Sequence, residues 1–113
     1  MDNVKIDIKT GTIGPHHDPY GTELVVVRRG TKEASWYSDG LGQERLWLVE
    51  GQEIVRKLEW IDVTYSKDSA NKEALAKILF RRWVGISCAD AKEEYERQYN
   101  NFEDPMGRLS DYV

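Results

Sequence analysis

Short glycine-containing turns between segments rich in β-branched and aromatic residues constrain the fold of this chain most. Gly30-Thr31 follows residues 24–28, and Glu50-Gly51 follows residues 45–49. Turns of two residues join neighbouring antiparallel strands, because they leave no room for a crossover. A looser connection, residues 39–43, joins the two predicted hairpins. The sequence therefore predicts an antiparallel β-meander.

Two further segments extend this prediction. Residues 3–9 alternate apolar and charged side chains, the period of a strand with one buried face. Residues 11–21 are dense in turn formers and are predicted as a loop. Residues 52–61 fit either a strand or one helical face, and we favour the strand because a tight turn precedes them. The helical interpretation of that segment stays open.

The last third of the chain is predicted as two helices. The first is capped by Asp68 or Ser69 and ends at Gly85; the second is capped by Ser87 and stops at Asp104-Pro105. The apolar stripe of the first helix is predicted as Ala74, Leu75, Ile78, Leu79 and Trp83. That of the second is predicted as Cys88, Ala91, Tyr95, Tyr99 and Phe102.

These elements indicate an α+β fold, an antiparallel β-meander of about four or five strands packed on one face by a C-terminal pair of helices. We expect a single domain over residues 1–113. Residues 1–65 are mainly strands, residues 68–103 form the two helices, and residues 104–113 form a tail.

The predicted strand register assigns side chains to two sheet faces. Trp36 is placed opposite Val25 and Trp47, and Trp47 opposite Ile54. The core face then contains Val25, Val27, Ala34, Trp36, Trp47, Val49 and Ile54. The second face contains Leu24, Val26, Tyr37, Leu46, Leu48 and Val55, which is more apolar than a solvated face. It could be covered by the N-terminal strand with residues 10–21, by a second copy of the chain, or by another protein.

Candidate catalytic residues are few. His16, His17 and Asp18 are metal-ligand and acid-base types, but three consecutive residues rarely point at one ion, so a polar surface loop is favoured. If this loop takes part in catalysis or metal binding, His17 and Asp18 are the candidates for the acid-base or ligand roles. Cys88 could be a nucleophile at the start of a helix, but we favour a structural role as a small buried apolar residue. No metal or other cofactor is expected.

Basic residues beside aromatic ones give an alternative function. Arg28, Arg29, Arg56 and Lys57 could contact the phosphates of a nucleic acid or nucleotide. Acidic neighbours of the basic pairs and the placement of Trp36 and Trp47 on the core face argue against this interpretation. The net charge of −4 comes from the residues after Cys88 and argues against nucleic-acid binding by that end.

Composition narrows the classes of protein to which this chain can belong. No apolar run approaches the ~20 residues of a membrane span, and the first residues lack a signal-peptide core, so a cytoplasmic protein is expected. The single cysteine excludes an intramolecular disulfide.

We favour a non-enzymatic regulator, inhibitor or adaptor that binds another protein, or a second copy as a homodimer. The predicted partner-binding residues are Leu24, Val26, Tyr37, Leu46 and Leu48. An enzyme using His16, His17 and Asp18 is the third hypothesis.

Overall fold

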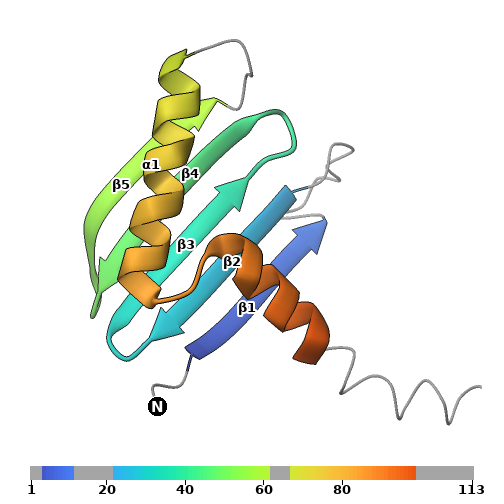
Figure 1. Cartoon of the computed structure of the whole chain (residues 1–113), viewed down its shortest axis with the longest axis vertical. Helices are drawn as coiled ribbons and strands as arrows, with labels where there is room; N and C mark the ends of the chain where they lie inside the picture. Colours follow the sequence, from blue (N-terminus) through green and yellow to red (C-terminus); the bar gives the residue numbers. More distant parts are fainter. Residues whose placement is uncertain (1–3, 12–21, 62–66, 99–113) are drawn as a thin grey trace, which may run out of the picture.

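The structure, a computed structural model, describes residues 4–11, 22–61 and 67–98. Five strands form one antiparallel sheet in chain order (Figure 1). The strands are β1 (Val4–Gly11), β2 (Thr22–Arg29), β3 (Lys32–Ser38), β4 (Gln43–Glu50) and β5 (Glu53–Ile61). Helix α1 (Lys67–Val84) and a second helix, residues 88–98, lie on the same face of the sheet. The predicted α+β meander with a C-terminal helix pair is thus confirmed.

Local turn and cap chemistry explains where these elements end. The predicted Gly30-Thr31 turn is confirmed, with Gly30 at a φ of +62°. Gly85 ends α1 with a φ of +76°, and the Arg29 guanidinium occupies the space that a Cβ at this position would need. Ser87 caps the second helix, since its Oγ accepts a hydrogen bond from the Asp90 N–H at 3.0 Å. The ambiguous segment of residues 52–61 is largely strand β5, as we favoured.

The core lies between the sheet and the two helices. Its fully enclosed side chains include Val25 and Val27 of β2, Leu46 of β4, and Phe80 and Val84 of α1. Trp36 is the aromatic centre of this layer, with edge-on contacts to Trp60 at 5.0 Å and Phe80 at 6.3 Å between ring centroids. We call this side of the sheet the covered face and the opposite side the open face.

The predicted register is correct for β2 and β3 and wrong for β4. Trp36 pairs with Leu46 instead of Trp47. The reason is the β3–β4 connection, in which the Asp39 N–H donates to the Gln43 carbonyl at 3.1 Å and leaves three residues in the loop. The predicted register required an even number of residues in this loop. A shift of one residue moves every side chain of β4 to the other face of the sheet.

This shift corrects two predicted binding residues. Leu46 and Leu48 are 1% and 3% exposed on the covered face, so they are core residues and cannot contact a partner. Trp47 and Val49 take their places on the open face. Ile54, predicted in the core, pairs with Val49 and is 62% exposed.

Two other predictions are also corrected. The buried side chains of α1 are Ala76, Phe80 and Val84, so the predicted apolar stripe was on the wrong side of the helix. Of its predicted members, Leu79 and Trp83 pack at the margin of the core, whereas Ala74, Leu75 and Ile78 are exposed. Strand β1 does not lie over the second face, because it pairs with β2 at the edge of the same sheet. Residues 10 and 11 belong to β1, and residues 12–21 lie outside the described residues.

Candidate functional site

The open face has an apolar centre between charged margins. Its centre combines Leu24 and Val26 of β2, Tyr37 of β3, and Trp47 and Val49 of β4, all of them partly buried. Lys5, Asp7 and Lys9 of β1 lie along one margin, and Lys57 and Glu59 of β5 along the other. No described segment packs over this face, because both helices occupy the opposite one. A large apolar centre with a polar rim is typical of protein interfaces.

The strand register brings the central side chains together. Val26 lies opposite Ser35, and Ser35 lies opposite Trp47, so one row crosses the sheet from β2 to β4. Ser35 is only 7% exposed, which shows that its larger neighbours shield this small residue. In the next row, Leu24 lies opposite Tyr37. The predicted residues Leu24, Val26 and Tyr37 therefore do share one face.

Polar contacts fix the groups around this centre. The Arg28 guanidinium contacts a Glu33 carboxylate oxygen at 2.7 Å, and the Arg45 guanidinium lies 5.7 Å from the centre of the Tyr37 ring. At the β5 margin, the Lys57 ammonium lies 3.4 Å from the Glu59 carboxylate. Basic side chains outnumber acidic ones on the open face, although the whole chain carries a net charge of −4. The open face therefore carries an excess of positive charge at its margins.

Sequence reasoning missed Trp47 and Val49, yet one signal was present. Asp39 precedes Gly40, a combination typical of turns in which the carboxylate binds nearby N–H groups. In the structure, the Asp39 Oδ1 accepts hydrogen bonds from the N–H groups of Leu41 at 2.8 Å and Gln43 at 3.0 Å. Counting the loop from Asp39 would have given the observed register.

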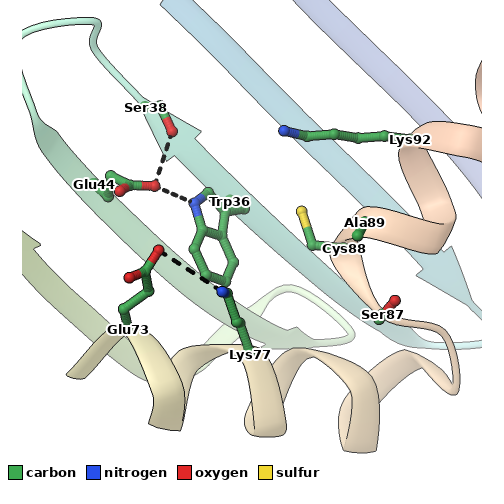
Figure 2. A pocket seen from close by; sticks show the side chains of 9 residues that line it. All are labelled: Trp36, Ser38, Glu44, Glu73, Lys77, Ser87, Cys88, Ala89 and Lys92. Atoms are coloured by element: carbon green, nitrogen blue, oxygen red, sulfur yellow. Dashed lines mark hydrogen bonds and ion pairs between the residues drawn. The ribbon is translucent and has the colours of Figure 1, made fainter. Parts of the chain in front are cut away.

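The covered side contains a hollow of about 350 Å³ between α1, the second helix and the sheet (Figure 2). Its lining residues are Trp36, Ser38, Glu44, Glu73, Lys77, Ser87, Cys88, Ala89 and Lys92. The Glu44 Oε1 accepts hydrogen bonds from the Trp36 indole N–H at 2.7 Å and from the Ser38 hydroxyl at 3.1 Å. Lys92 forms an ion pair with Glu23 at 2.6 Å, and Lys77 lies 4.0 Å from Glu73.

The environment of Cys88 does not activate its thiol. Burial raises the pKa of Cys88 to about 11, and the nearby Lys92 ammonium offsets only part of this increase. Burial also acts to lower the pKa of Lys92, but the hydrogen bond and charge of Glu23 outweigh it and raise that pKa. The hollow therefore presents a protonated thiol and ion-paired side chains, which supports the packing interpretation of Cys88.

The basic residues of the nucleic-acid alternative are distributed over both sheet faces. Arg28 and Lys57 lie on the open face, each beside a carboxylate. Arg29 lies beneath Gly85, and Arg56, opposite Leu48, is on the covered side. The structure does not gather these four residues into one phosphate-binding surface.

Other sequence-derived candidates lie elsewhere. His16, His17 and Asp18 are outside the described residues. Within residues 4–11, 22–61 and 67–98, no group of three or more His, Cys, Asp or Glu side chains is arranged to hold a metal ion. In the same ranges, no helix combines the length and apolar character needed to cross a membrane.

Comparisons with protein-family models, curated proteins and solved structures give no match to this chain.

Proposed function

We propose that this protein is a non-enzymatic binding protein whose open face docks onto a different protein with an apolar, acid-rimmed surface. The observation that carries the proposal is the row of Val26, Ser35 and Trp47 at the centre of a sheet face without a described cover. Trp, Tyr and Arg dominate the binding energy of many interfaces, and Trp47, Tyr37 and Arg45 adjoin one another here.

Charge favours a different protein over a second copy stacked on this face. Two identical open faces would each bring an excess of basic groups, including Lys5, Lys9 and Arg45, to the same interface. Like charges across an interface oppose association, whereas an acidic rim would neutralise them. A regulator, inhibitor or adaptor function is consistent with such a surface.

The test is affinity capture from the host extract with three versions of the full chain. Wild type and Leu41→Lys, altered at a loop side chain that is 65% exposed, should retain the same protein, and Trp47→Glu should lose it. Circular dichroism checks that all three versions are folded. Addition of salt should also weaken capture, because the rim charges are exposed. Equal retention by Trp47→Glu, or no protein whose retention depends on Trp47, would contradict the proposal.

A further inference from the structure

Strand β5 is an exposed sheet edge with apolar side chains. Ile54, Val55 and Ile61 are 62%, 56% and 49% exposed. No described strand pairs with the outer side of β5, which is the last strand of the sheet. Exposed apolar edge strands are templates for pairing with another strand. The opposite edge, β1, alternates Val4, Ile6 and Ile8 on the covered face with charged side chains on the open face.

The sequence of β5 is self-complementary about Leu58. In an antiparallel pair related by a two-fold axis at Leu58, Lys57 lies opposite the partner's Glu59, and Glu59 lies opposite the partner's Lys57. The same register places Arg56 opposite the partner's Trp60 and brings Val55, which lies at a β-bulge, near the partner's Ile61, and each of these pairs occurs twice by symmetry. Opposite charges and apolar pairs directly across two strands both stabilise pairing.

Neighbouring registers lack this complementarity. Because facing side chains in an antiparallel pair point to the same side of a sheet, the symmetry axis must coincide with a residue. An axis at Lys57 would place two lysines opposite each other, and an axis at Glu59 would do the same with two glutamates. Like charges directly opposite destabilise a strand pair. An axis at Val55 would place Glu53 opposite the partner's Lys57, but the β-bulge at Val55 interrupts the regular strand there. The charge pattern together with the bulge therefore favours Leu58.

We propose that a second copy of this chain pairs antiparallel along β5, with Leu58 at the two-fold axis. The two sheets then form one continuous sheet, with both helix layers on the same side and both open faces on the other. Lys57 and Glu59, each 54% exposed and 3.4 Å apart within one chain, extend their ion pair into a ladder across the axis. This interface borders the open face, because Lys57 lies opposite Trp47, but the two proposals are tested by different substitutions.

Sedimentation velocity of the full chain over a wide concentration range tests the proposal. We expect a monomer of 13.1 kDa to give way to a species of twice that mass as concentration rises. Lys57→Glu and Glu59→Lys should each raise the dimer dissociation constant roughly tenfold or more, because each replaces two opposite-charge pairs with like-charge pairs. Val55→Lys should weaken the dimer through loss of the apolar pairs.

The decisive sample is an equimolar mixture of Lys57→Glu and Glu59→Lys. Across the two different chains, positions 57 and 59 again carry opposite charges, so the mixture should recover the dimer that neither variant forms well alone. Within each variant the two positions carry like charges, so recovery cannot come from an intrachain ion pair. Circular dichroism confirms that each variant remains folded.

Two controls separate this interface from others. Leu41→Lys, at an exposed apolar loop residue, and Leu24→Glu, at the open-face centre on β2, should both leave the dimer dissociation constant unchanged, because β3 and β4 separate β2 from β5. A chain that stays a monomer at every concentration would overturn the proposal. A dimer insensitive to the charge reversals, or a mixture that fails to recover it, would also overturn it.

Discussion

The two faces of the sheet are built from the same residue types but differ in what surrounds them. On the covered face, Val25 and Leu46 are 0% and 1% exposed beneath the helices. On the open face, their sequence neighbours Leu24 and Trp47 remain partly accessible. The covered face therefore contributes mainly to stability, because burial removes its apolar surface from water. The open face has comparable apolar groups that no described segment covers. Substitutions at adjacent residues can separate the two contributions.

The largest contrast is expected between Leu46→Glu and Trp47→Glu. A charge at Leu46 would lie unpaired in the core and should cost about 4 kcal/mol or more, enough to unfold much of the protein at 25 °C. Trp47→Glu should cost about 1 kcal/mol, because its side chain is partly exposed. Urea unfolding followed by circular dichroism measures both values. Similar losses from the two substitutions would contradict the face assignment.

Glu44 and Arg45 offer a polar version of the same contrast. Glu44→Ala removes the acceptor of the Trp36 indole N–H, which is 2.7 Å from the carboxylate, and should cost about 1–3 kcal/mol. Arg45→Ala removes a guanidinium above the Tyr37 ring on the open face and should cost about 1 kcal/mol or less. Chemical denaturation of both variants tests this order, and a larger loss for Arg45→Ala would reverse it.

The titration of Cys88, on the covered side of the sheet, should make the stability of the folded protein decrease slightly at alkaline pH. The folded-state pKa of about 11 lies above the ordinary value of 9.0, so the folded state binds this proton more tightly than the unfolded state. The resulting stability is fully present below pH 9 and is lost as pH rises toward 11. Between pH 8 and pH 10, wild type should lose about 1 kcal/mol more than Cys88→Ala. Equal losses in the two proteins would show that Cys88 does not contribute.

The smallest effect is expected for the Arg28–Glu33 ion pair on the open face. The Arg28 side chain is 59% exposed, so a double-mutant cycle with Arg28→Ala and Glu33→Ala should give a coupling of about 0.2–1 kcal/mol. High salt should reduce this coupling further. A coupling that is larger, or independent of salt, would indicate that this face is shielded from solvent in the free protein.

The strength of each sequence signal explains which parts of the fold were predictable. The Gly30-Thr31 turn and the Ser87 cap depend on a few adjacent residues, and both were found at the expected positions. The open-face residues Leu24, Val26 and Tyr37 were placed correctly because the first hairpin fixes their register. Leu46 and Leu48 were misplaced because the next connection has an odd number of loop residues, determined by Asp39.

In helix α1, too, the sequence alone could not predict which side chains are buried. Apolar residues occur around much of its circumference, so several stripes fit a helical period. The observed orientation buries Phe80, whose ring packs edge-on against Trp36 of β3. That contact joins residues far apart in the chain and leaves Ile78 50% exposed.

The sequence by itself determined most local features of this protein: the alternating strands, the Gly30-Thr31 turn, the Ser87 cap and hence the α+β meander. The predicted Glu50-Gly51 turn was wrong by one residue, because Glu50 pairs with Glu53, and the predicted cap at Asp68 or Ser69 was wrong, because α1 already includes Lys67. These features depend on interactions among residues a few positions apart, which a single sequence displays directly. Only the tertiary structure decided that Trp47 faces outward, that Leu46 is in the core, and that β5 is an apolar edge. The parity of a loop and the packing of Phe80 on Trp36 determine which face each side chain occupies, and neither has a local periodic signature.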